Sequence, residues 1–138
     1  MHATRRGARS YRDLIAWQRA FALADRCLDV ADGLPARHGA LAAQIRRSSV
    51  SVASNIAEGN GRLTLPDYLR HLRIAHGSLT ELETQLLLAQ SRHRGGGAAV
   101  AGAIDAAAET SRVLGGLMRS LRRLAEEGGR NAKGAGSP

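Results

Sequence analysis

The chain has 138 residues, a single cysteine and a formal net charge of +8 at pH 7. This length suits one domain, which can bury roughly two-thirds of the surface of its unfolded chain. Cys27 has no second cysteine to pair with, so an intramolecular disulfide is excluded. No apolar run is long enough to span a bilayer, and the basic N-terminus is not followed by the apolar segment of a signal peptide. We therefore expect a cytoplasmic protein that does not enter the membrane.

The composition favours helices and an aliphatic core, because the chain has only four aromatic residues and many alanines and leucines. Its positive charge comes from 19 Arg and 1 Lys against 6 Asp and 6 Glu. Guanidinium groups bind phosphate bidentately, which is compatible with a nucleic-acid partner. A GC-rich genome would also enrich arginine, alanine and glycine, so the composition alone leaves both interpretations open.

The first predicted helix covers residues 11–31 and ends before Gly33 and Pro35. Ser10, with Asp13 three residues later, resembles a capping box at its start. Apolar residues recur at spacings of three and four, as expected for a packed helix. This predicted seam consists of Leu14, Trp17, Phe21, Ala24, Leu28 and Ala31.

The second predicted helix covers residues 39–58 and carries four serines and an asparagine in an otherwise helical pattern. Ser48 and Ser49 lie between the apolar positions Ile45 and Val52, on or beside the buried stripe. Small side chains allow neighbouring backbones to approach closely. We therefore expect a helix packed on more than one side, by its own bundle and by another subunit. The sequence Gly59-Asn60-Gly61 predicts a left-handed C-cap.

Two longer helical patterns follow. Thr64 is a predicted N-cap for the third helix, with Pro66 in its first turn, and the apolar stripe runs to about Ser91. A glycine-rich turn leads into the fourth helix, which we expect to end at Glu127. Short turns between long helices make neighbours antiparallel. The predicted fold is all-α, an antiparallel up-down-up-down four-helix bundle at 11–127, with a flexible basic arm at 1–10 and a disordered glycine-rich tail at 128–138.

Three segments carry a family resemblance: residues 13–20, 44–62 and 74–86. Over roughly residues 11–124 the chain resembles the 23S rRNA-intervening sequence proteins, relatives of the accessory variability proteins of diversity-generating retroelements. The resemblance implies a homo-oligomer, specifically a pentamer with a basic surface. In the retroelement branch it implies binding to RNA or DNA and to a reverse transcriptase. The sequence leaves open whether the chain belongs to that branch.

Motifs for catalysis are missing from the sequence. A di-metal carboxylate site in a four-helix bundle needs paired Glu-x-x-His motifs, and none occurs. His71 and His76 are five residues apart and lie on different faces of one helix. The serines lack a nucleophile elbow, and no phosphate-binding loop is present. We expect no catalytic residue, no metal site and no cofactor, and hence no enzyme.

A polar row at spacings i, i+4, i+8 and i+11 runs along the second helix, opposite polar residues of the third. We interpret it as a hydrogen-bonded structural seam rather than a ligand site, because buried polar groups must be satisfied and can specify one packing. The predicted seam consists of Arg47, Ser51, Asn55, Glu58, Ser78 and Glu81.

Other arginines should gather at one end of the bundle, because alternating helix directions bring together the first helix start, the second turn and the fourth helix end. They could hold a phosphate backbone without reading sequence, since no recognition motif is present. The candidate nucleic-acid-binding residues are Arg5, Arg6, Arg9, Arg12, Arg62, Arg119, Arg122 and Arg123. The leading hypothesis is a non-enzymatic homo-oligomer that binds RNA or DNA electrostatically. The alternative is an oligomeric protein-interaction scaffold without nucleic-acid binding.

Overall fold

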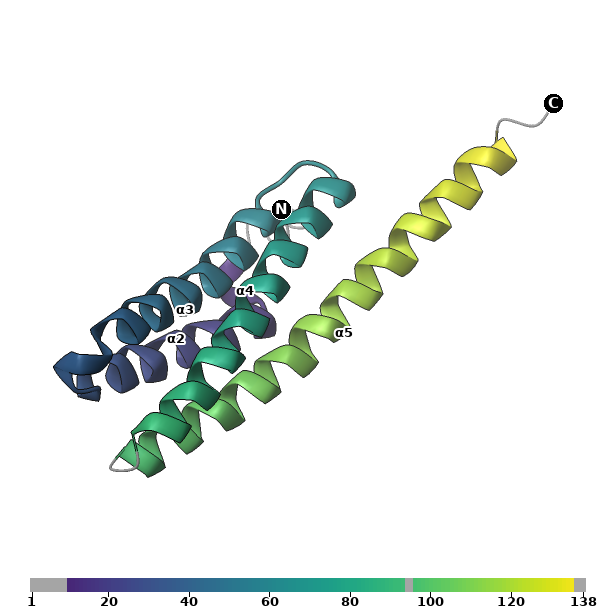
Figure 1. Ribbon diagram of the computed structural model, residues 1–138. Helices are drawn as coiled ribbons and strands as arrows, with labels where there is room; N and C mark the ends of the chain where they lie inside the picture. Colours follow the sequence, from purple (N-terminus) through teal and green to yellow (C-terminus); the bar gives the residue numbers. More distant parts are fainter. Residues whose placement is uncertain (1–9, 94–95, 136–138) are drawn as a thin grey trace.

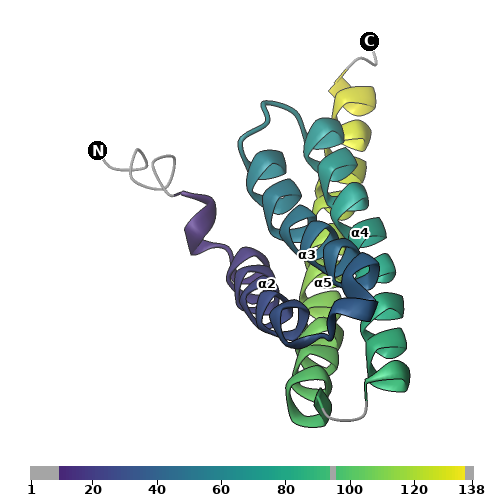
Figure 2. The same ribbon diagram turned by 60° about the vertical axis from the view of Figure 1, so that its left-hand side comes forward.

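The computed structural model describes residues 10–93 and 96–135, and within them every regular element is helical. The elements are η1 (Tyr11–Asp13), α2 (Ile15–Gly33), η2 (Ala36–His38), α3 (Gly39–Asn60), α4 (Leu65–Arg92) and α5 (Gly97–Ala135). The four α-helices run alternately up and down, as Figures 1 and 2 show. The predicted all-α four-helix bundle is therefore confirmed.

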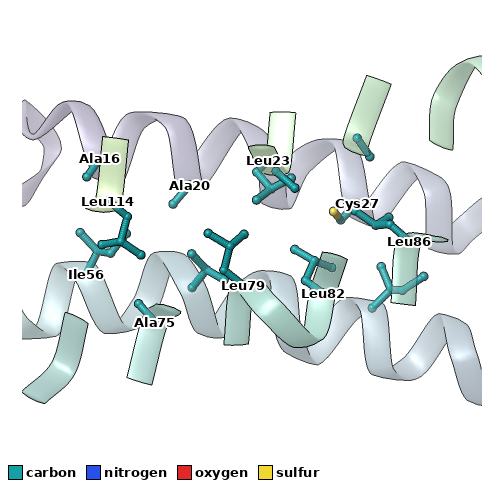
Figure 3. Packing of buried hydrophobic residues seen from close by; sticks show 14 of the residues in the cluster. Ala16, Ala20, Leu23, Cys27, Ile56, Ala75, Leu79, Leu82, Leu86 and Leu114 are labelled. Atoms are coloured by element: carbon teal, nitrogen blue, oxygen red, sulfur yellow. The ribbon is translucent and has the colours of Figure 1, made fainter. Parts of the chain in front are cut away.

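Each helix packs against two neighbours around one aliphatic core. Helix α2 contacts α3 and α5, and α4 contacts the same two helices, so α2 and α4 lie diagonally across the bundle. Figure 3 shows their side chains meeting in the middle, with Leu23 and Cys27 of α2 directed at Leu79 and Leu82 of α4. Burying one such leucine stabilises the fold by about 1.5 to 3 kcal/mol.

Side chains cap two of the helix starts. Thr64 accepts a hydrogen bond from the amide of Asp67 at 3.3 Å, with Pro66 in the first turn of α4, which confirms the predicted cap. Ser10 accepts from the amide of Arg12 at 3.0 Å, but it caps η1 rather than α2. The first predicted helix is thus divided, with a short 3-10 turn before the α-helix proper.

The prediction of a left-handed glycine cap after the second helix is wrong. Gly61 has a φ of −84°, and no glycine among the described residues has positive φ. Gly59 instead permits a close helix contact, since a Cβ atom there would lie 2.8 Å from the Cβ of His71. The glycine is needed at this position for space rather than for an unusual backbone conformation.

The predicted apolar seam of the first helix is also wrong. The residues of α2 that enter the core are Ala16, Ala20, Leu23, Cys27, Val30 and Ala31. Of the predicted seam only Ala31 belongs to this set, while Phe21 is 57% exposed and Leu28 is 36% exposed. Helix α2 carries two adjacent apolar faces, and a spacing of three and four residues does not decide which face enters the core.

Helix α5 continues beyond its predicted end at Glu127 and reaches Ala135. Its 39 residues correspond to a length of about 58 Å, and its C-terminal part projects past the bundle in Figures 1 and 2. Each residue added to an existing helix forms a further backbone hydrogen bond, so Gly128 and Gly129 weaken the helix without ending it. The prediction of a disordered tail is therefore wrong up to Ala135. Residues 136–138, and residues 1–9 of the predicted arm, lie outside the described residues.

Candidate functional site: exposed arginines and the two grooves beside α3

Three residues of the predicted polar seam meet between α3 and α4. The hydroxyl oxygens of Ser51 and Ser78 lie 2.9 Å apart and share a hydrogen bond. The side-chain amide of Asn55 donates to the carbonyl oxygen of Ser51 at 2.9 Å and to its hydroxyl at 3.1 Å. These bonds satisfy half-buried polar groups at the helix contact, as a structural seam requires.

Glu58 belongs to a different cluster, at the end of α3 and the start of α4. Its carboxylate lies 3.6 Å from the guanidinium of Arg62 and 3.6 Å from Nε2 of His71. The other ring nitrogen of the buried His71 lies 3.0 Å from the carbonyl oxygen of Asp67. Sequence reasoning missed the part of His71, whose position opposite Gly59 is visible only in the fold.

Arg47 and Glu81, the remaining residues of the predicted seam, line a polar groove between α3 and α4. Neither forms an ion pair with any residue that the structure describes. The groove has a volume of about 310 Å³ and is lined by Gln44, Arg47, Ser48, Ser51, Ser78, Glu81 and Gln85. Gln85 is only 8% exposed, and its side-chain oxygen has no hydrogen-bond partner among the described residues. Sequence reasoning gave Gln85 no place in the seam.

An apolar groove of about 340 Å³ lies on the other side of α3, between α3 and α2. Trp17, Phe21 and Leu28 line it from α2, with Val50 and Ala57 from α3. The ring of Trp17 lies 5.1 Å from that of Tyr11 and 5.2 Å from that of Phe21, measured between centroids. Three of the four aromatic residues therefore gather at this surface and not in the core.

The predicted arginine cluster is only partly assembled within the described residues. The guanidinium carbon of Arg12 lies 6.0 Å from the centre of the Tyr11 ring, and Arg62 contacts Glu58 and His71. Arg5, Arg6 and Arg9 lie outside the described residues. Arg119, Arg122 and Arg123 are exposed on α5 and form no ion pair with a described residue.

Four exposed arginines form a row along α5: Arg112, Arg119, Arg123 and Arg130. Their spacings of i, i+7, i+11 and i+18 place them on one helix face over about 27 Å. We call these four residues the α5 arginine row. Sequence reasoning missed Arg112 and Arg130. The spacing itself was visible, but the predicted helix end at Glu127 hid the last member.

Other arginines are neutralised by neighbouring carboxylates. Arg19 lies 2.6 Å from Glu109, and Arg46 lies 3.0 Å from Asp32. Arg70 lies 3.2 Å from Asp67. The members of the α5 arginine row have no such partner among the described residues, so their charges are available to an external anion.

Groups suited to catalysis do not converge in the described part of the chain. It contains no cluster of three or more His, Cys, Asp or Glu residues that could hold a metal ion. Cys27 is fully buried, and burial raises the pKa of its thiol to about 12, which keeps it protonated at neutral pH. A separate search of the described helices for a membrane-crossing segment found none with the necessary length and apolar character.

The fold and these surfaces define a small all-α protein, an antiparallel four-helix bundle with a basic outer row and an uncovered apolar groove. The sequence profile of the 23S rRNA-intervening sequence proteins matches residues 12–116, and the chain belongs to this family. The match covers α2, α3, α4 and the first half of α5, so Arg119, Arg123 and Arg130 lie beyond it. No curated protein matches the chain.

Proposed function

We propose that this protein is a non-enzymatic homo-oligomer, pentameric as the family resemblance implies, that binds RNA or DNA through the α5 arginine row. A reverse transcriptase is the candidate partner enzyme. The proposal is carried by one observation, the presence of four exposed arginines on one helix face with no carboxylate partner among the described residues.

The chemistry of the row suits a phosphate backbone. Guanidinium groups bind phosphate oxygens bidentately and remain charged at any physiological pH. A length of about 27 Å corresponds to roughly eight base pairs of duplex at 3.4 Å each. Helix α5 contains no aromatic side chain on which a base could stack. Binding through this row is therefore expected to be electrostatic and indifferent to sequence.

Salt dependence tests the proposal. We expect the double variant Arg119→Gln/Arg123→Gln to reduce the slope of log affinity against log salt by about 1.8 on duplex DNA, because each lost phosphate contact contributes about 0.9. The matched control is Arg46→Gln/Arg70→Gln, which removes the same charge from arginines that already have carboxylate partners. The slope of the control should stay close to that of the wild type.

The second candidate function is a protein-interaction scaffold without nucleic-acid binding, and the uncovered apolar groove between α2 and α3 favours it. In that case the arginines reflect composition alone. The same titration separates the two functions. If the purified protein retains neither RNA nor duplex DNA at low salt, the nucleic-acid proposal is wrong and the scaffold stands.

A further inference from the structure

Helix α3 carries unsatisfied groups on both of its outer sides. Its outward ridge consists of small residues, Ala43, Val50, Ser54 and Ala57. The apolar groove lies on one side of this ridge and the polar groove on the other. We call the ridge together with its two grooves the α3 surface. A ridge of small side chains lets another backbone approach closely, so the surface is shaped to be packed against.

The apolar side of the α3 surface exposes large side chains next to one another. Phe21 is 57% exposed, Val50 is 47% exposed, and both line the same groove together with Trp17 and Leu28. Isolated apolar residues on a protein surface are ordinary, but a contiguous apolar groove marks an interaction site. Because α2 spends three aromatic or leucine side chains on this face, the groove is a feature of the sequence and not an accident of packing.

The polar side is incomplete as well. The side-chain oxygen of Gln85 is buried without a partner in the described part of the chain, and this arrangement costs free energy unless a donor reaches it. Arg47 and Glu81 line the same groove and lack ion-pair partners there. Two neighbouring grooves thus require different complements, one apolar and one hydrogen-bonding, and a single packed protein surface provides both.

The rest of the chain does not have the residues to cover this surface. Outside the described residues there are only 1–9, 94–95 and 136–138. Residues 1–9 carry three arginines and a single large apolar side chain, Met1, which cannot fill a groove lined by Trp17 and Phe21. The occupant is therefore a separate molecule.

Charge and size point to a second copy of the same chain. Asp25 lies in the apolar groove, Glu81 lies in the polar groove, and Arg47 lines the polar groove beside the ridge, so each copy presents both signs to the other. The 22 residues of α3 give a length of about 33 Å, and the width of two helix spacings is about 18 Å. The resulting area of roughly 600 Å² is close to the roughly 800 Å² that each partner contributes to a stable interface.

We propose that the α3 surface is where one copy of this protein binds the next. The proposal rests on the homo-oligomer of the proposed function and names the surface that builds it. The neighbour buries Phe21 and Val50, and it supplies a donor to the side-chain oxygen of Gln85.

Sedimentation velocity of point variants tests the proposal. We expect Phe21→Glu and Val50→Glu each to sediment as monomers at a concentration where the wild type is assembled. Both side chains are exposed, so the bundle itself should keep its helical circular dichroism. The matched control is Leu124→Glu, which places the same charge on a 52% exposed leucine of α5, and it should remain assembled.

Cross-linking gives a second readout that does not depend on breaking the assembly. A maleimide photo-crosslinker attached to a Ser54→Cys variant should join two copies of the chain, because Ser54 lies on the ridge and the buried Cys27 thiol does not compete. If the wild type is assembled but neither glutamate variant dissociates and Ser54→Cys gives no cross-link, the α3 surface is wrong while the homo-oligomer stands. A wild type that sediments as a monomer overturns both.

Discussion

Gly59 controls how closely the end of α3 approaches the start of α4. A methyl group at this position would lie 2.8 Å from Cβ of His71 and 3.1 Å from the ring of Tyr68. Because neither a Cβ atom nor the backbone beside it can move alone, the two helices would have to separate. We expect Gly59→Ala to lower the free energy of unfolding by about 1 to 3 kcal/mol, measured by urea denaturation.

Gly77 provides the control for this prediction. It lies in the middle of α4 and is exposed, and a Cβ atom there would meet no atom within 4 Å. Alanine is the better helix former, so Gly77→Ala should raise the free energy of unfolding by about 0.5 to 1 kcal/mol. If both variants shift stability in the same direction, helix propensity and not the contact with His71 decides the result at Gly59.

Cys27 makes stability depend on pH in the alkaline range. Burial raises the pKa of its thiol from 9.0 to about 12, so between these values the unfolded chain loses the proton and the folded chain keeps it. Folding stability therefore falls as pH rises above 9, by up to about 1.4 kcal/mol per pH unit for this one group. We expect the wild type to lose this much relative to Cys27→Ala between pH 9 and 10.5, measured by urea unfolding of both proteins. Parallel pH profiles would contradict the prediction.

Single residues of the candidate site were only partly predictable. The row of polar residues on α3 follows from spacing, and Ser51 and Asn55 do meet Ser78 across the helix contact. The positions of Glu58 and Gln85 did not follow, because spacing along one helix does not say which residue of a neighbouring helix lies opposite. That information depends on the rotation of each helix about its own axis.

Among the elements, α2 shows why the fold was predictable and its core face was not. Gly33 and Pro35 mark the end of this helix, and its apolar spacing predicts a packed helix. However, alanines and leucines occupy one face while aromatic residues occupy the next. Large side chains were taken for the core seam, whereas the small face containing Ala16 and Ala20 is the one that permits close packing. The misassigned face is the apolar groove, where we propose that a second copy binds.

The C-terminal extension of α5 adds helix without adding core. Residues 128–132 and 134 are all exposed, so deleting residues 128–138 should change the free energy of unfolding by less than about 0.5 kcal/mol. The same deletion removes Arg130 and should reduce the salt slope on duplex DNA by about 0.9. As a control within α5, Leu114→Ala removes a fully buried side chain and should cost about 2 to 5 kcal/mol. A large loss of stability on deletion would mean that the extension packs against another surface.

For the whole molecule, assembly and charge should act together. One α5 arginine row is long enough for roughly eight base pairs, so a single copy binds a short ligand as fully as an oligomer does. On a longer strand, an oligomer brings several rows to the same molecule, and the second row binds at a high effective concentration. Such multivalency can strengthen binding by about 10² to 10⁴ without any new contact.

We therefore expect Phe21→Glu, which alters no arginine, to weaken binding to a 60-nucleotide RNA by about 100-fold or more and binding to an 8-nucleotide RNA by much less. Fluorescence anisotropy at low salt measures both affinities. The variant Gln90→Glu adds the same negative charge at an exposed position of α4, outside the α3 surface, and corrects for the change in net charge. An equal loss of affinity on the two RNAs would mean that the rows act independently, and nucleic-acid binding would then not depend on assembly through the α3 surface.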